Sequence, residues 1–415
     1  MTAEFYRDLI ESLGFEFHPA GPAIDPDDRA LIARVMDPVR GPDTLVKDVL
    51  MPSLRADYVA LDHAARDVDL MVTHPITFAA PVIAQARGLP WVSTVLAPMS
   101  FFSPTDVPVL PPAPFLAHLG RLGPFYGRIV AHVARRQTRG WMQPVSELRR
   151  ELGLPPGEHP LFEGQFSPAL TLALFSRVLA TPQPDWPRNV SVTGFVFYNG
   201  PDALPPELEA FLNAGPPPVV FTLGTSAVAA AGSFYEESVE AVRQLGIRAV
   251  MLTGGFEQNC PRAVLPPGVL LVDRAPHQSL FPRAAAVVHQ GGAGTLAQTL
   301  RAGRPMLVVP HAHDQPDNAS RVVKLGVART LLPRSYRGRR VARQLERLLN
   351  DTAVLRVHRR LRQSCVQRAP ARRPRRSIRL SGRGGEPHGS TLVLIFRSAT
   401  RTTSDTLTDK ERLDA

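Results

Sequence analysis

Short apolar runs alternate with helical patterns along most of the chain. Four runs in the first half have the length and composition of buried parallel strands, namely Asp69–Thr73, Leu89–Val95, Ala169–Phe175 and Val190–Gly194. Five more follow in the second half, at Val219–Leu223, Ala249–Leu252, Val269–Val272, Ala286–His289 and Met306–Val309. Helical windows such as Phe234–Leu245 and Thr295–Ala302 lie between them. The alternation predicts a doubly wound α/β fold in two copies.

The spacing of these runs also predicts domain boundaries. Residues 1–200 are expected to form one domain and residues 219–350 a second. The Pro-rich stretch 201–218, around a short helix at Glu207–Asn213, is expected to be the linker. From residue 351 to 415 the helical periodicity gives way to Arg-Pro repeats and a Ser/Thr-rich end. Such a composition cannot pack a core, so a basic, low-complexity tail is expected, either disordered or translated out of frame.

The excess of positive charge lies almost entirely in the tail. The chain carries a formal net charge of +11, but residues 354–415 alone hold 15 Lys/Arg against 5 Asp/Glu, which leaves the body nearly neutral. An arginine-rich arm for nucleic acid is one interpretation. Out-of-frame translation of a GC-rich gene also produces Arg/Pro-rich sequence, and we favour it, so no nucleic-acid partner is expected.

Cysteine content and hydropathy indicate the compartment. Two cysteines, Cys260 and Cys365, provide neither a disulfide framework nor a metal-finger spacing, which suits a reducing cytoplasm. No apolar run reaches the roughly 18 residues of a membrane span, and the first residues lack a signal-peptide pattern. We therefore expect a cytoplasmic protein, with at most peripheral membrane contact.

The most informative segment is His289-Gln290-Gly291-Gly292-Ala293-Gly294-Thr295. A predicted strand ends at His289, glycines follow, and a helix begins near Gly294. Glycines allow close backbone approach, and the amino end of a helix offers free N–H groups, so this is a site for an anion such as a diphosphate. The spacing differs from G-x-G-x-x-G, and no acidic residue follows about 20 residues later, which disfavours a nicotinamide oxidoreductase.

Further polar groups follow other predicted strands, and the carboxyl ends of parallel strands share one edge of a sheet. We expect these groups to converge on the same site: Thr225, Ser226, Arg274, His277, Asp314, Gln315 and Asn318. Hydroxyls at Thr225 and Ser226 suit phosphate, and carboxylate and amide groups at Asp314 and Gln315 suit sugar hydroxyls. Simple helix caps are the alternative interpretation for both groups.

These residues form a recognisable set. The motifs P-H-x-x-L-F from Pro276, H-Q-G-G-A-G-T from His289, G-R-P from Gly303 and D-Q-x-x-N from Asp314 resemble the donor-binding signature of family 1, UDP-glycosyltransferase-like enzymes. The nearest branch is the bacterial natural-product, glycolipid and sterol type, and the resemblance covers about residues 2–350. It implies the GT-B fold, with two doubly wound Rossmann-like domains facing a central cleft.

The resemblance assigns roles to particular residues. It implies that His289 contacts the donor diphosphate, which Gly292, Ala293, Gly294 and Thr295 also bind. Asp314 and Gln315 would hold the transferred sugar, with Asn318 nearby. Arg274 stands where many relatives stack a tryptophan on the nucleobase, His277 replaces a glutamine, and Gln298 lies beside the position of a ribose-binding glutamate. The choice between a uridine and a thymidine nucleotide therefore stays open.

The implied activity is inverting transfer of a hexose from a UDP- or TDP-sugar to a hydroxyl of a small apolar acceptor, without a metal. Family members begin with a strand and a loop that carries the histidine base. The segment Glu4–His18 resembles the helix and strand that come later, so we expect the first strands to be missing. A nucleotide-sugar-binding protein without activity is thus the alternative function. His74, at a strand's carboxyl end, is a candidate replacement base.

An aromatic and Pro-rich excursion at residues 99–145 interrupts the alternation. Its aromatic residues, Phe101, Phe102 and Trp141 among them, predict an apolar acceptor pocket, with a structural excursion over the sheet as the alternative. Asp67 and Asp69 precede a strand and indicate a solvated turn. His311 and His313 lack a third ligand cluster, so no metal site is expected.

Overall fold

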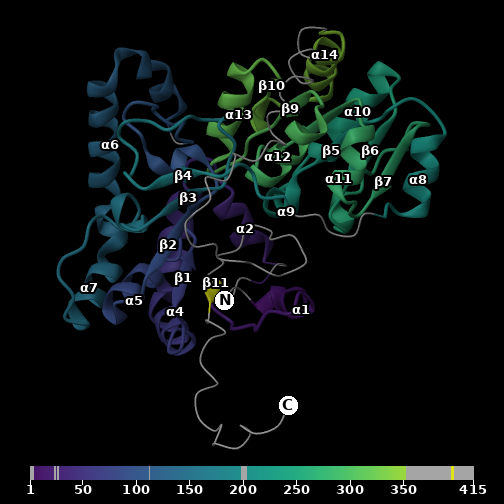
Figure 1. Ribbon diagram of the computed structural model, residues 1–415. Coiled ribbons are helices and arrows are strands. Elements are labelled where there is room, and N and C mark those ends of the chain that lie inside the picture. The colour runs from purple at the N-terminus through teal and green to yellow at the C-terminus, as the bar shows by residue number, and fades with distance from the viewer. Residues whose placement is uncertain are drawn as a thin grey trace, which may run out of the picture.

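The computed structural model describes residues 4–22, 25, 28–111, 113–197, 203–351 and 394–396. Two sheets lie side by side, each flanked by helices (Figure 1). The first has the strand order β11-β1-β2-β3-β4, and the second has the order β10-β9-β8-β5-β6-β7. All neighbouring strands are parallel except β11 and β1. The predicted pair of α/β units is confirmed.

The four apolar runs of the first half all become strands of the first sheet, each somewhat shorter than predicted: β1 (Leu70–Thr73), β2 (Trp91–Val95), β3 (Thr171–Ala173) and β4 (Val190–Val192). The helices around this sheet are α1 (Arg7–Ser12), α3 (Gly41–Thr44), α4 (Met51–Ala64), α5 (Ala79–Arg87), α6 (Pro124–Thr138) and α7 (Gln143–Glu151). Helices α4, α5 and α7 pack their apolar faces into one core with β1, around Leu61, Met71 and Ile83.

The amino-terminal segment differs from its prediction. Residues 7–12 form helix α1, but residues 15–18 form no strand. The free edge of β1 is instead paired with β11 (Leu394–Phe396), antiparallel, with Ile395 opposite Met71. A structureless tail is therefore the wrong expectation for these three residues. The Arg-rich remainder of the tail lies outside the described residues.

The second sheet contains β5 (Val219–Thr222), β6 (Ala249–Leu252), β7 (Val269–Val272), β8 (Ala286–His289), β9 (Met306–Val308) and β10 (Ala328–Thr330). From β5 the chain moves outward to β6 and β7, then returns to β8 on the other side of β5. This reversal is the topological switch point of a doubly wound sheet. Ligands bind outside the strand carboxyl ends at such a point, which here lies between β5 and β8.

Helices cover both faces of the second sheet: α9 (Gly224–Ala227), α10 (Phe234–Leu245), α11 (His277–Leu280), α12 (Ala293–Ala302), α13 (Gln315–Lys324) and α14 (Gly338–Leu349). Successive residues of β5 pack on opposite sides: Phe221 in a core with α10 and α14, and Val220 in a core with Phe281. Burial on both faces explains why these strands are continuous apolar runs rather than alternating ones.

Two segments cross the predicted domain boundaries. Helix α8 (Pro206–Asn213) lies in the expected linker, yet Leu208 and Leu212 are buried in the core of the second sheet. Helix α2 (Arg29–Val35) lies in the expected first domain, yet Ile32 and Met36 pack into the core that β5 forms with α10 and α14 in the second domain. The prediction that residues 201–218 are a linker is therefore wrong for α8, because the apolar side of this helix is buried in the second domain rather than exposed to solvent.

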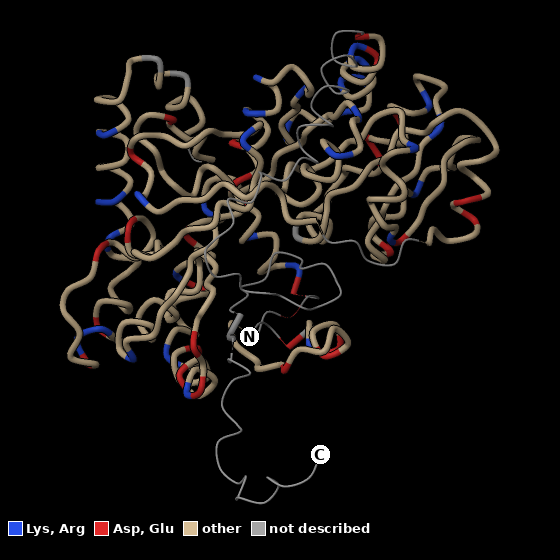
Figure 2. Tube along the Cα trace, viewed as in Figure 1, with Lys and Arg blue, Asp and Glu red and all other residues tan. Residues whose placement is uncertain are grey.

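Charged residues are dispersed over the described part of the chain. Lys and Arg are interspersed with Asp and Glu on both halves (Figure 2). This distribution agrees with the near-neutral body expected from the sequence. Among the described residues, no helix is both long and apolar enough to cross a membrane.

Candidate functional site

The glycine turn after β8 lies at the switch point of the second sheet. Gly291 has φ +94°, and a Cβ there would lie 2.8 Å from Cγ1 of Val308, so both the backbone and the neighbouring strand require glycine. Gly224, which follows β5, has φ +61°, and a Cβ there would lie 2.2 Å from Nε2 of Gln290. The loops after β5 and β8 therefore touch, as the shared edge predicted.

His289 is fully buried at the end of β8. The backbone N–H of Gly291 donates to its Nδ1 over 3.0 Å. Burial, with a smaller effect of nearby His277, lowers the pKa of His289 to about 3. The ring is therefore neutral near pH 7, and because Nδ1 accepts a hydrogen bond, the proton is on Nε2. Nε2 is buried and has no hydrogen-bond partner among the described residues, so one donor remains for a ligand.

Helix α12 begins directly after the turn, at Ala293. Its first backbone bond runs from Leu296 N to Gly292 O, so the N–H groups of Ala293, Gly294 and Thr295 have no partner within the helix. A Cβ on Gly294 would meet no atom within 4 Å, so open space lies beside this backbone. The helix end, its partial positive charge and the His289 donor suit an anion, and binding of the diphosphate by these residues stays a prediction. Thr295 itself is buried.

The two hydroxyl residues after β5 lie in the short helix α9. Thr225 is exposed, and the side chain of Ser226 is outside the described residues. The contact between Gly224 and Gln290 brings this helix to the glycine turn. Phosphate binding by Thr225 and Ser226 stays a prediction.

Helix α13 begins with the D-Q-x-x-N motif, and two of the motif's side chains hydrogen-bond neighbouring backbone. Gln315 Oε1 accepts from the N–H of His311 at 2.8 Å, and Asn318 Nδ2 donates to Gly291 O at 3.0 Å and to Asp314 Oδ2 at 2.7 Å. Asn318 thus holds α13 against the glycine turn rather than pointing toward a sugar. Of the three predicted residues, Asp314 is the one with a carboxylate at the helix start, and Asp317 follows it in the first turn.

Loss of water strongly affects the Asp314 carboxylate. Desolvation, more than any other cause, raises the pKa of Asp314 to about 6, while the hydrogen bond from Asn318 opposes the rise. His313, the preceding residue, has φ +56°, a left-handed conformation that is unusual for a non-glycine residue, and its ring hydrogen-bonds the backbone of Val35 in α2. The amino-terminal segment therefore supports the turn that carries Asp314.

The predicted nucleobase residues lie on the same side of the sheet. Arg274 is exposed just after β7. The ring of His277 stacks on Phe281, with centroids 4.3 Å apart, and α11 contacts α12. Gln298 is buried within α12. The structure thus brings His277 close to His289, while the nucleobase contacts themselves stay predictions.

The acceptor-pocket residues do not gather as predicted. Phe101 is buried in the core of the first sheet, stacked on Trp186 with ring centroids 4.2 Å apart. Phe102 contacts Phe162 in a different environment, and Trp141 packs beside α4 and α7. A pocket lined by Phe101, Phe102 and Trp141 is therefore wrong, because Phe101 and Trp141 pack in two separate cores and Phe102 lies against Phe162. The exposed apolar side chains of this excursion are instead Phe115, Leu119, Leu122, Phe125, Ile129 and Val133.

His74 follows β1, as expected. Its backbone N–H donates to Thr77 Oγ1 at 3.0 Å, and its carbonyl accepts from the same hydroxyl, so the residue begins a tight turn. Burial lowers the pKa of His74 to about 4. Its Nδ1 is buried with no hydrogen-bond partner in the described part of the chain. The ring is neutral near pH 7 but is a weak base.

Two features of the site were missed in the sequence. Gln290 links the loops after β5 and β8, although its place between His289 and Gly291 identified it only as part of a motif. Asp317 and Arg321 of α13 contact the first domain, and their spacing of four residues on a helix was the available signal. Among the described residues, no cluster of three His, Cys, Asp or Glu side chains is arranged to hold a metal.

Comparisons with known proteins show the family and the fold of this chain. The family described as "Erythromycin biosynthesis protein CIII-like, C-terminal domain" matches residues 249–373. O-mycaminosyltylonolide 6-deoxyallosyltransferase of Streptomyces fradiae is 34% identical over 343 residues, which cover 80% of this chain and 77% of that protein.

Solved structures show the same fold. The calicheamicin glycosyltransferase CalG4 aligns with TM-score 0.62 and 19% identity, covering 88% of this chain and 85% of that one. The spinosyn rhamnosyltransferase SpnG, solved with thymidine diphosphate, aligns with TM-score 0.57 and 18% identity over 88% of this chain and 86% of its own. At these identities the likeness concerns the two-domain architecture.

Proposed function

The chain belongs to the family 1 GT-B glycosyltransferases, in their natural-product branch, and from this premise we propose that it transfers a hexose from a UDP- or TDP-sugar to a hydroxyl of an apolar acceptor, with inversion. The observation that carries the proposal is the neutral His289, whose buried Nε2–H has no partner among the described residues and lies beside the amino end of α12. A diphosphate supplies the acceptor atoms that these donors require.

In the proposed reaction, the acceptor oxygen forms a bond to the anomeric carbon while the bond from that carbon to the diphosphate oxygen breaks. The electron pair of the broken bond stays on the diphosphate, which gains negative charge. Donors that are already oriented toward developing charge stabilise a transition state without reorganisation. His289 Nε2–H and the free N–H groups of α12 are such donors, and we propose that they take the place of a metal.

The proton of the acceptor hydroxyl must pass to a base. His74 is the candidate from this chain, because a neutral imidazole with an unpartnered Nδ1 can accept a proton. Its lowered pKa makes it a weak base, and a base is most effective when its pKa is near the working pH. A His74→Ala variant with undiminished turnover would remove His74 from the mechanism.

The donor sugar is proposed to contact Asp314 and Gln315 at the start of α13, and the nucleobase to stack on the exposed Arg274. A guanidinium plane stacks on either pyrimidine, so the residue type suits both nucleotides. The presence of thymidine diphosphate in the spinosyn rhamnosyltransferase structure supports the thymidine nucleotide.

The acceptor is proposed to be an apolar natural product, bound by the exposed apolar face of residues 114–138. Phe115, Leu122 and Phe125 are 61%, 65% and 72% exposed, which is unusual for a cluster of this kind unless something covers it. Names of several relatives include an acceptor, namely O-mycaminosyltylonolide, the vancomycin aglycone and a sterol, and these support the proposed class. Cytoplasmic action fits a protein that uses nucleotide sugars.

Titration of the protein with TDP-glucose and UDP-glucose, followed by an assay with O-mycaminosyltylonolide, tests the proposal. We expect one of the two nucleotide sugars to bind and its hexose to appear on the acceptor with inverted anomeric configuration. Binding without transfer to this acceptor or to water would favour the alternative of a nucleotide-sugar-binding protein without activity. Failure of both nucleotides to bind would contradict the donor site.

A further inference from the structure

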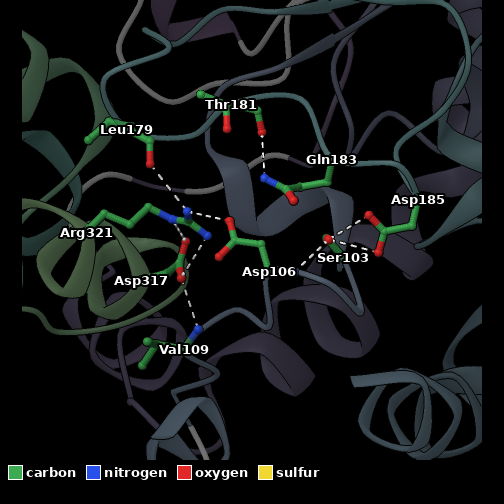
Figure 3. Close-up of polar contacts among 9 residues, drawn as sticks. All are labelled: Ser103, Asp106, Val109, Leu179, Thr181, Gln183, Asp185, Asp317 and Arg321. Carbon is green, nitrogen blue, oxygen red and sulfur yellow. Dashed lines mark hydrogen bonds and ion pairs between the residues drawn. The ribbon is translucent and has the colours of Figure 1, made fainter. Parts of the chain in front are cut away.

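A buried polar cluster joins the two domains beside the donor site (Figure 3). Arg321 of α13 donates from Nη1 to Asp106 Oδ2 at 2.7 Å and from Nε to Asp317 Oδ2 at 2.7 Å. Asp317 Oδ1 also accepts the backbone N–H of Val109 at 3.0 Å, and Arg321 Nη1 reaches Leu179 O at 3.4 Å. Two residues of one helix thus contact three residues of the other domain.

Burial makes this cluster stronger than an ordinary surface ion pair. The side chains of Arg321 and Asp317 are 9% and 3% exposed, and that of Asp106 is 30% exposed. Burial alone would lower the pKa of Arg321, but the two carboxylates outweigh it and the pKa is raised. Exposed ion pairs contribute little, whereas removing one partner of a buried pair is strongly destabilising. The cluster therefore resists separation of the two surfaces.

The contacted loop is held rigidly on its own side. Ser103 Oγ donates to both carboxylate oxygens of Asp185, at 2.8 and 2.9 Å, and Thr105 N donates to Asp185 Oδ2 at 2.9 Å. The neighbouring Trp186 stacks on Phe101. The segment Ser103–Val109 is therefore fixed to the first sheet, so whatever contacts Asp106 and Val109 is fixed to that sheet as well.

Helix α13 carries two side-chain pairs, each with a spacing of four residues. Asp314 and Asn318 face the glycine turn, where Asn318 binds Gly291 O. At about 100° per residue, the centre of the Asp317–Arg321 pair lies about 60° around the helix from the centre of the Asp314–Asn318 pair. One rigid helix therefore connects the glycine turn with the loop of the other domain.

We propose that Asp317 and Arg321 are positioning residues. By binding the loop Ser103–Val109, they fix the Asp314 end of α13 relative to the first, acceptor-binding domain. The expected effect on catalysis rests on the proposed function, but the contact between α13 and the loop Ser103–Val109 is present in the fold itself. Transfer requires the anomeric carbon and the acceptor oxygen to be aligned closely, and a misplacement of about 1 Å costs on the order of 100-fold in rate.

The test uses Asp106→Ala, which removes the ion pair across the domains, one of the three contacts, and leaves the buried Asp317–Arg321 pair intact. Asp62→Ala is the matched control. The Asp62 carboxylate is also 30% exposed and binds Arg87 Nε at 2.6 Å, but both residues lie within the first domain. Asp106→Glu keeps a carboxylate for Arg321 and serves as the conservative rescue.

The first readout is the distance between the domains, and it needs no substrate. Spin labels are placed at Val133→Cys on α6 and Gln244→Cys on α10, both exposed, with Cys260 and Cys365 replaced by Ser. Double electron–electron resonance should show one narrow distance distribution in the parent and in Asp62→Ala, and a broader or shifted one in Asp106→Ala. Identical distributions in all three would overturn the proposal.

The second readout separates positioning from folding. With TDP-glucose and O-mycaminosyltylonolide, Asp106→Ala should lower kcat by about 10- to 100-fold. The Kd for TDP should stay within about twofold, because all the residues proposed to bind TDP lie in the second domain. Asp106→Glu should recover most of kcat. Equal losses in Asp106→Ala and Asp62→Ala would indicate a general effect on stability and contradict the proposal. If the parent binds no nucleotide, the proposed function is wrong. The distance measurement still shows whether the contact with Asp106 fixes the two domains relative to each other.

Discussion

The backbone N–H of Gly291 donates to Nδ1 of His289 over 3.0 Å and thereby determines which ring nitrogen carries the proton. The imidazole is buried and neutral, and its Nε2–H has no hydrogen-bond acceptor among the described residues. The same glycine adopts φ +94° and presents its carbonyl to Asn318. One turn therefore orients the histidine and anchors helix α13.

Replacing His289 with Ala is expected to lower kcat by about 10²- to 10³-fold, because one preorganised donor to the leaving diphosphate is lost. The measurement is turnover of the nucleotide sugar that binds. Since His289 is buried, the variant also loses stability, so Val288→Ala is the control. Val288 is equally buried but packs in the core on the other face of β8. A similar fall in kcat for both variants would contradict the assigned role.

Gly294 and Gly291 should respond to alanine in opposite ways. A Cβ on Gly294 meets no protein atom and its φ is not left-handed, so Gly294→Ala should leave stability unchanged or raise it by about 0.5 kcal/mol while weakening binding of TDP, whose oxygens need that space. Gly291→Ala meets Val308 at 2.8 Å with φ +94° and should destabilise the fold by about 1–3 kcal/mol.

Thermal unfolding with and without TDP measures both effects. An increase in Tm for Gly294→Ala that is accompanied by unchanged TDP affinity would show that the diphosphate does not approach this backbone. A stable Gly291→Ala variant would show that the turn tolerates a side chain, contrary to its geometry.

The second domain was largely predictable because its strands are buried on both faces and therefore leave continuous apolar runs. The turn from His289 to Thr295 was predictable for a different reason, since its glycines are required by local backbone geometry. The role of Asn318 was not, because its side chain turns back to Gly291 O instead of outward, and that choice depends on the packing of α13.

The first domain was predicted less well for a physical reason. Aromatic residues such as Phe101 and Trp141 indicate apolar surroundings, but composition does not distinguish the lining of a pocket from the filling of a core. Helix α2 packs on the second domain and β11 pairs with β1, and both contacts join segments far apart in the sequence. The local pattern of apolar residues does not predict which segment will be the partner. The sequence likewise predicted Asp314 as a polar residue at a strand end, but the rise of its pKa depends on surroundings that only the fold supplies.

Donor binding should depend on pH through Asp314. Burial raises its pKa to about 6, so the carboxyl is neutral below that pH and becomes an acceptor for two sugar hydroxyls above it. The affinity for TDP-glucose, whose diphosphate does not titrate in this range, should rise between pH 5 and 7. Asp314→Asn should show weaker binding without that rise. A parallel rise in the variant would assign the pH dependence to another group.

The same shift has a defined sign for stability. A raised pKa means that the folded state binds the proton more tightly, so Asp314 contributes stability below its unfolded pKa, and this is lost as the pH increases through about 6. The Tm of Asp314→Asn relative to the parent should therefore grow between pH 4.5 and 7. A difference that stays constant over this range would contradict the raised pKa.

Pairing of β11 with β1 predicts that the tail segment stabilises the first sheet. Met71 N–H donates to Pro90 O on the β2 side, so Ile395, opposite Met71, makes no backbone hydrogen bond to β1, and the hydrogen-bonded pair next to it is Phe396 with Leu70. Proline has no backbone N–H, so Phe396→Pro should unpair β11, whereas Phe396→Val should not. The edge of β1 would then lose its partner, and the backbone amides of Leu70–Val72 that face β11 should exchange with solvent faster. Hydrogen–deuterium exchange of β1, with β6 as the internal reference, measures this directly. Equal exchange of β1 in the proline and valine variants would show that the tail strand does not hold this edge in solution.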